Sequence, residues 1–324
     1  MPFRRKRPRL IMGFALGFLA LFWSQAVRAQ VKLEYKFPES NTLKYKTSAK
    51  TTHILTLAGQ EFETVNEETV VKSRAVGMKR ADGGLPIEEK VDSLRIDLAI
   101  PGGIKVNYDS SDPNAKIDNP DLAFLAEAFN LVAETVYTVV LDSANKVKAV
   151  EGAEKLLEKA DKLSQQARDV IRSHLETDRL KQDFEQELGN VPDIVTRPGE
   201  SWERSEVSNI GNGQTLHFQK KYEYVGTEKK GDKTLDKIRG TATKIELKQD
   251  PAVNAQLKVL NGELKVDSSE ETILFDRALG RVENSHMKVR IKGDKLTFSI
   301  NGMELEGGLD LTMETTTELQ PAAK

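Results

Sequence analysis

The sequence predicts an α+β protein in which a curved, half-barrel-like antiparallel β-sheet carries a central helical segment packed on one face. Three observations predict it. Residues 32–108 and 199–319 show the two-residue alternation and turn signals of strands. Residues 118–189, which lie between them, show mainly the wider spacing of helices. The order strands, helices, strands is typical of an antiparallel sheet with its helices on one side.

The first strand region is rich in β-branched and aromatic residues. Glycine-rich breaks at 82–84 and 101–103 divide it. Leu94, Ile96 and Leu98 alternate with polar neighbours, as half-buried strands do. We therefore expect long antiparallel strands here.

A helix start follows at 119–121. Asn119 can cap a helix, proline is favoured at the first helical position, and an acid suits the first turn. Beyond this short helix, apolar runs over 136–141 and 147–150 flank a Ser-Ala-Asn turn. They predict a small hairpin inside the helical segment.

Two further helices are expected after this hairpin. Apolar residues recur at helical spacing over 153–171, which predicts one amphipathic helix. Another helix is expected to end at Gly189, because glycine favours the position after a helix and Pro192 cannot continue it.

The C-terminal strand region holds two Asn-Gly pairs, at 261–262 and 301–302. Both positions of a tight hairpin turn need positive φ, which Asn and Gly tolerate, so each pair predicts a hairpin. The pair at 301–302 sets a register with Phe298 opposite Leu305. The last strand alternates over 309–314, which predicts one face on a core and one in water. The ending at 320–324 is expected to be a frayed tail.

Residues 1–29 have the pattern of a cleaved secretory signal peptide. Five basic residues precede an apolar run of 14 residues over 10–23, and Ala29-Gln30 is the expected cleavage site. A membrane-spanning helix needs roughly 20 residues. The alternative is an uncleaved N-terminal anchor. Arg4-Arg5 lacks the following apolar residues expected for twin-arginine export, so the sequence indicates ordinary export to the periplasm or the extracellular space.

Composition bounds the class of protein. The chain has no cysteine, so core packing must hold it together without disulfides, and no lipid can be attached to a cysteine thiol. Removing 1–29, with six basic and no acidic residues, changes the net charge from −2 to −8. An acidic chain is a poor nucleic-acid binder. We interpret Lys220-Lys221 and Lys229-Lys230 as solvated faces, and we expect no second membrane span and a soluble product.

The domain boundaries follow the same pattern. We expect N-terminal strands over 30–117, the helical segment over 118–196 and a C-terminal meander over 197–320. Together, 30–320 are expected to form one composite domain. The oligomeric state is left open.

No motif indicates a metal, cofactor or catalytic site. The four histidines have no metal-ligand spacing, and we interpret them as ordinary strand or helix residues: His53, His174, His217 and His286. Ser201 follows Gly199 but lacks the second glycine of a nucleophile elbow, so we interpret this stretch as a loop that delivers Trp202 into the sheet. The stretch 211–213 is interpreted as a strand connection rather than a dinucleotide loop.

Acidic residues give no clearer indication of chemistry. The stretch 109–119 lacks the spacing of a calcium loop, so we interpret it as a polar loop leading to the helix cap. Paired carboxylates occur at 67–68 and 270–271, and nothing in the sequence singles out an acid with a raised pKa.

Five short segments carry a family resemblance. They are 106–110, 139–152, 198–202, 272–282 and the signal peptide. In these the chain resembles an uncharacterised family of exported bacterial proteins, a domain of unknown function common in planctomycete-like bacteria. The order of elements is also similar to the half-barrels of periplasmic lipoprotein carriers, whose sheets close around an apolar cavity.

Three functional hypotheses remain open. The first is a non-enzymatic envelope protein that binds an apolar ligand, a lipid or a lipoprotein on the concave face of its sheet; the rival interpretation is that the apolar faces only pack on each other. The second is a structural or protein-interaction component of the cell envelope. The third is an exported hydrolase with a carboxylate site, which two facing acids in a deep cleft would support.

Overall fold

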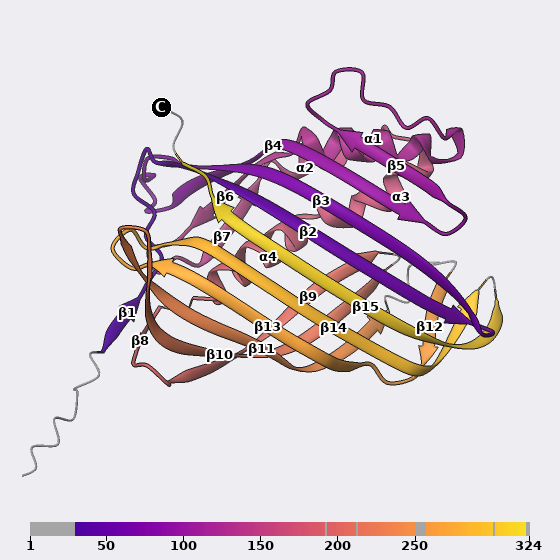
Figure 1. Cartoon of the computed structure of the whole chain (residues 1–324). Coiled ribbons are helices and arrows are strands. Elements are labelled where there is room, and N and C mark those ends of the chain that lie inside the picture. Colours follow the sequence, from indigo (N-terminus) through magenta and orange to yellow (C-terminus); the bar gives the residue numbers. More distant parts are fainter. Residues whose placement is uncertain (1–29, 192, 212, 250–256, 301, 322–324) are drawn as a thin grey trace, which may run out of the picture.

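The computed structural model describes residues 30–321 except 192, 212, 250–256 and 301. The predicted signal peptide and the end of the tail, 322–324, lie outside the described residues. In the described chain, one large curved antiparallel sheet dominates (Figure 1), and its main path runs β7-β6-β4-β3-β2-β15-β14-β13-β11-β10-β9. The predicted curved antiparallel sheet with helices on one face is confirmed.

The strands of the main path have the following bounds: β2 (Thr42–Leu57), β3 (Gln60–Val76), β4 (Leu85–Ile100), β6 (Val136–Leu141), β7 (Val147–Glu151), β9 (Ser201–Gly211), β10 (Gln214–Lys230), β11 (Lys233–Gln249), β13 (Lys265–Asp276), β14 (Arg281–Ile300) and β15 (Met303–Leu319). Off this path, β5 (Ile104–Asp109) pairs with β4 and β12 (Leu257–Asn261) with β14, while β1 (Val31–Leu33) pairs with β8 (Ile194–Thr196). The pairing of β2 with β15 joins the two strand regions of the chain at the centre of the sheet.

The two faces of the sheet differ in charge. The convex face carries cross-strand ion pairs such as Lys50 with Glu67 at 2.6 Å and Lys288 with Glu314 at 2.9 Å. The concave face carries most of the buried apolar side chains, Leu311 of β15 among them. Because successive strand residues point to opposite faces, the alternating sequence produces this division.

The helices are η1 (Pro120–Leu122), α1 (Ala123–Ala133), α2 (Ala153–Ala160), α3 (Gln165–Leu175) and α4 (Thr177–Gly189). Figure 1 shows them together on one side of the sheet. The expected cap is present, since the Asn119 side chain accepts a hydrogen bond from the Asp121 amide at 3.0 Å. The small hairpin and the helix ending at Gly189 also form where the sequence predicted them.

The single helix predicted over 153–171 is wrong, because the chain breaks between α2 and α3. Ser164 is the N-cap of α3, and its hydroxyl accepts from the Ala167 amide. This cap satisfies a backbone donor that a continuous helix would have bonded to its own carbonyls. The break lets Leu156 of α2 and Ile171 of α3 both pack in one cluster with Leu131 of α1.

One of the two predicted hairpins is also wrong. β14 and β15 pair around 301–302 with Phe298 opposite Leu305, as expected. At 261–262, however, β12 and β13 both pair with β14 instead of with each other. Gly262 passes so close to β14 that an added Cβ would lie 2.7 Å from the Lys295 carbonyl oxygen. The glycine therefore serves a close backbone approach there rather than a tight turn.

Two apolar clusters hold α4 against the concave face. Phe184 packs with Ile87 and Leu141 in the first, and Leu188 packs against the second, which contains Phe275. An amphipathic helix gains most of its stability from such burial. α4 is therefore fixed across the curved sheet, and its remaining face lies over the region described below.

The β2–β15 pairing provides a matched test of the fold. A methyl group on Gly307 would lie 2.0 Å from the Thr56 carbonyl oxygen, whereas one on Gly308 would lie 3.2 Å from the Gly293 carbonyl oxygen. We expect Gly307→Ala to lower the free energy of unfolding by about 1–3 kcal/mol, through backbone displacement. Gly308→Ala should cost clearly less. Urea unfolding measures both, and equal losses would contradict the strand register.

Candidate functional site: a cavity beneath helix α4

A cavity of about 220 Å³ lies between α4 and the concave face of the sheet. Arg179, Asp183 and Gln186 of α4 line it, and their spacing of four and three residues places them on one helix face. Nine strand residues complete the lining: Glu206, Val207, Ser208, Phe218, Lys220, Ala242, Met287, Val289 and Met313. The helix side is thus polar, and most of the sheet side is apolar.

The apolar side of the cavity continues into the largest core cluster of the concave face. Phe218, Ala242 and Val289 line the cavity and also belong to this cluster, which contains Ile291 and Phe298. The cavity therefore lies at the edge of this apolar cluster, between the cluster and the charged side chains. A site of this kind presents an apolar surface and polar groups to the same bound molecule.

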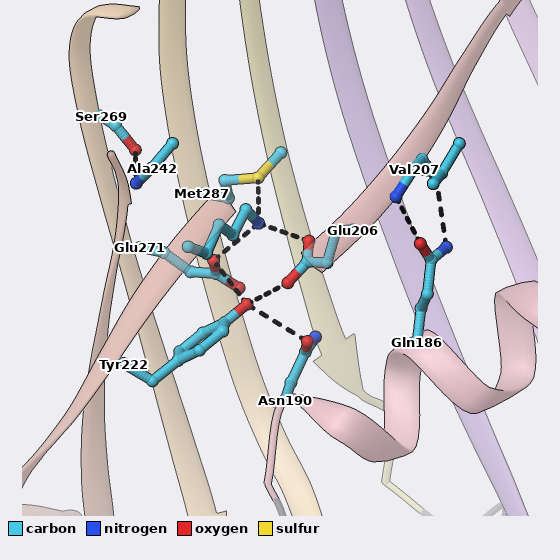
Figure 2. A network of polar contacts seen from close by, with 10 residues as sticks. Gln186, Asn190, Glu206, Val207, Tyr222, Ala242, Ser269, Glu271 and Met287 are labelled. Atoms are coloured by element: carbon cyan, nitrogen blue, oxygen red, sulfur yellow. Dashed lines mark hydrogen bonds and ion pairs between the residues drawn. The ribbon is translucent and has the colours of Figure 1, made fainter. Parts of the chain in front are cut away.

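A buried lysine between two carboxylates borders the cavity. Figure 2 labels the two acids, Glu206 and Glu271, and Tyr222 beside them. Lys220 Nζ lies 2.7 Å from Glu206 Oε2 and 3.0 Å from Glu271 Oε2. The Tyr222 hydroxyl donates to Glu206 and lies 3.3 Å from Glu271. With the Asn190 amide nitrogen facing this group, it donates to Glu206 Oε1 and to the Tyr222 hydroxyl, each at 3.2 Å.

Burial and the neighbouring charges together set the pKa values of Glu271 and Lys220. Burial raises the pKa of the Glu271 carboxyl, an effect that Lys220 opposes and the charge of Glu206 reinforces. Burial alone would lower the pKa of Lys220, but the carboxylates of Glu271 and Glu206 outweigh it, so this pKa is raised. Lys220 is therefore held in its charged form, and its charge is balanced inside the protein.

The polar side chains of α4 are partly committed to contacts of their own. Arg179 Nη2 lies 2.9 Å from Asp183 Oδ1. The Gln186 amide bonds both the N–H and the C=O of Val207, a residue of the edge strand β9 (Figure 2). This side-chain amide occupies the backbone groups through which another strand could pair, so it attaches α4 to the sheet edge.

A second buried ion-pair group lies beside the cavity, where Glu187 follows Asp183 by one helical turn of α4. The Arg74 guanidinium of β3 donates to both carboxylate oxygens of Glu187, at 2.8 and 2.9 Å, and also to Glu89 of β4. Arg74 also lies 4.7 Å from the centre of the Phe184 ring. This bidentate contact fixes the helix against β3 and β4.

The histidines do not form a site. His53 and His217 lie on β2 and β10, His174 lies in α3, and His286 bonds Thr316 at 3.0 Å. Among the described residues, no group of three or more potential metal ligands is placed to hold an ion. The stretch 109–119 forms a polar loop before the helix cap, as expected.

Ser201 begins β9, and the following Trp202 stacks on Tyr222 with ring centres 5.8 Å apart. This agrees with the expectation that Trp202 enters the sheet.

The sequence analysis did not identify most of the residues that line the cavity. The interpretation of Lys220-Lys221 as a solvated face is wrong for Lys220, which is only 6% exposed. Glu271 of the 270–271 pair is buried and has the raised pKa that the sequence did not single out. The alternation Phe218, Lys220, Tyr222 was the available signal, because it places the lysine on an apolar face.

The fold and cavity define a protein with an open, curved antiparallel sheet and helices on its concave side. The chain belongs to DUF6263, a family of unknown function, whose family model matches residues 82–293. This agrees with the resemblance to a domain of unknown function. No curated protein matches the chain.

Several solved structures are similar in part. Lipovitellin, described for its lipid–protein interactions, matches 89% of this chain with a TM-score of 0.46 and 10% identity, and the chain spans 26% of the lipovitellin chain. A protein from Bacteroides fragilis classed as exported, with a YmcC-like fold, matches 91% of this chain and 100% of its own (TM-score 0.24, 7% identity).

A Vibrio parahaemolyticus domain classed as outer-membrane lipoprotein-sorting matches 86% of this chain and 87% of its own, with a TM-score of 0.13 and 10% identity. At these scores the three likenesses carry no functional argument. None of the described helices is long and apolar enough to cross a membrane.

Proposed function

We propose that this protein is a non-enzymatic, exported binding protein that takes the apolar chain of an amphiphilic molecule into the cavity beneath α4. The observation that carries the proposal is the lining of this cavity, apolar on the sheet and charged on the helix. Its 220 Å³ holds roughly seven groups of the size of a water molecule, at about 30 Å³ each. That volume suits part of one alkyl chain.

The cavity favours this function over the other two hypotheses. If the apolar faces only packed on each other, Phe218, Ala242 and Val289 would have no open space beside them. A carboxylate hydrolase needs two acids facing a substrate. Here both acids that line the cavity are paired with cations of the protein, Glu206 with Lys220 and Asp183 with Arg179. A purely structural role has no comparable feature in its favour.

The remaining expectations accompany this proposal as predictions. They are cleavage between Ala29 and Gln30, a soluble product in the periplasm or outside the cell, one composite domain over 30–320, and a planctomycete-like source. Native mass spectrometry of the protein, purified from its own exported compartment, tests both the cleavage between Ala29 and Gln30 and the presence of a bound ligand. A chain that starts at Gln30 with a retained amphiphile supports the proposal, and a full-length, membrane-held chain contradicts cleavage and a soluble product.

Filling the cavity provides the direct test. Ala242→Phe places a ring in the open space between α4 and the sheet, so we expect binding of a ten-carbon alkyl amphiphile to weaken at least about tenfold, the loss expected when roughly 1.4 kcal/mol of contact is removed. The fold should persist because the ring occupies existing space. Isothermal titration with decanoate and with decan-1-ol measures binding, and circular dichroism checks the fold.

The matched control is Ala75→Phe, because Ala75 lies on β3 next to the buried, concave-facing Arg74 and so points to the convex face. This control should leave binding unchanged. Equal binding by the wild-type protein and a folded Ala242→Phe variant would overturn the proposed site.

A further inference from the structure

One polar atom in the cavity lining has no partner within the described chain. Arg179 uses Nη2 to contact Asp183, but its Nε–H is buried and meets no acceptor. The Arg179 side chain is 16% exposed, so water has little access to it. Buried donors without acceptors are rare in native proteins and call for a specific explanation.

The other charged groups of the lining are satisfied internally. Lys220 and Glu206 contact each other, and Asp183 contacts Arg179. The Gln186 amide is bonded to Val207. The buried lining atom that lacks a partner in the described chain is therefore a donor, and it belongs to a permanent cation.

Positive charge near Arg179 accompanies this donor. Burial raises the pKa of the Asp183 carboxyl, and Arg179, Lys72 of β3 and His174 of α3 oppose this shift. Burial and the Arg179 charge lower the pKa of His174, so the standing positive charge around Asp183 comes from Arg179 and Lys72. An anionic oxygen placed at Arg179 would meet an N–H donor and a favourable field together.

We infer that the cavity selects anionic amphiphiles, with the oxygen headgroup accepting from Arg179 Nε and the alkyl chain lying on Phe218, Ala242 and Val289. This inference rests on the proposed function and adds the class of ligand. Fatty carboxylates and alkyl phosphates share the required chemistry, because both present charged oxygens on one chain. Arginine binds such oxygens through directed, charge-assisted hydrogen bonds.

The test compares three ten-carbon probes by isothermal titration: decanoate, decyl phosphate and decan-1-ol. We expect at least one anionic probe to bind about tenfold more tightly than the alcohol, as suits one charge-assisted hydrogen bond. Which anion binds better distinguishes the two ligand sources. Arg179→Met should abolish this preference, because it removes both the N–H donor and its charge.

A second variant guards against misfolding as the cause of any loss. Asp183→Asn removes the acid that competes for the guanidinium, so it should strengthen binding of the anionic probes several-fold, a gain that unfolding cannot produce. Arg172→Met is the matched control, since Arg172 pairs with Asp161 and does not line the cavity. It should change nothing.

The outcomes separate the two proposals. If Arg179→Met keeps the preference of the wild-type protein for anions, or if the wild type shows no such preference, the inference is overturned while binding of decan-1-ol still supports the proposed function. If the wild-type protein binds none of the three probes, the proposed function itself fails.

Discussion

Replacing Arg74 by methionine should lower the free energy of unfolding by about 3–5 kcal/mol, because it leaves a buried carboxylate without its partner. Glu89 bears most of this cost: its side chain is 6% exposed, and burial already raises its pKa. Glu187, at 46% exposed, can regain water. The loss would also weaken the attachment of α4 to β3 and β4, which Arg74 joins through Glu187 and Glu89.

Two further variants make this result specific. In Arg74→Met/Glu89→Met, an apolar pair replaces the buried ion pair, so most of the stability should return. Arg80→Met removes an exposed partner of Glu151 and should cost less than about 1 kcal/mol. Urea unfolding followed by circular dichroism measures all three. An Arg74→Met variant as stable as Arg80→Met would show that this ion-pair group does not hold the helix.

Lys220→Met should have a comparable effect, about 3–5 kcal/mol, for the same physical reason. Without the ammonium group, the carboxylates of Glu206 and Glu271 remain close together with no opposite charge between them. The additional substitution Glu271→Gln removes one of these charges and should restore a large part of the stability. Lys50→Met, which breaks an exposed pair with Glu67, is the matched control.

The stability that is lost in Lys220→Met should depend on pH in a defined direction. Burial raises the pKa of Glu271 in the folded chain above its ordinary value of 4.5. The folded chain therefore binds more protons than the unfolded chain between those two pKa values, and stability is lost as the pH rises through this window. Removing Lys220 raises the folded pKa further.

The loss in free energy of unfolding caused by Lys220→Met should accordingly be larger at about pH 8 than at about pH 5. Unfolding measured at both pH values, with the wild-type protein in parallel, checks the sign. A deficit that is independent of pH would indicate that Lys220 contributes by packing alone.

Local sequence was sufficient where a short segment decides its own conformation. The cap at Asn119, the hairpin over 136–151 and the register around 301–302 all formed as expected. Each depends on neighbours only a few residues away, through a capping side chain or a turn with positive φ. Local rules failed at Gly262, whose backbone passes so close to the distant residue Lys295 that an added Cβ would meet its carbonyl oxygen.

Alternation and helical spacing are local properties, so they predicted a cysteine-free chain of long antiparallel strands with helices on one face. The cavity and its lining, in contrast, depend on how distant segments pack together. Arg179 and Ala242 are far apart in the chain, and the packing of α4 across the sheet brings them to one cavity. Likewise, Lys220 of β10 becomes a buried ion-pair partner only because Glu206 comes from the neighbouring β9 and Glu271 from β13, beyond β11. Burial and charge pairing depend on such distant neighbours, so no local pattern could reveal them.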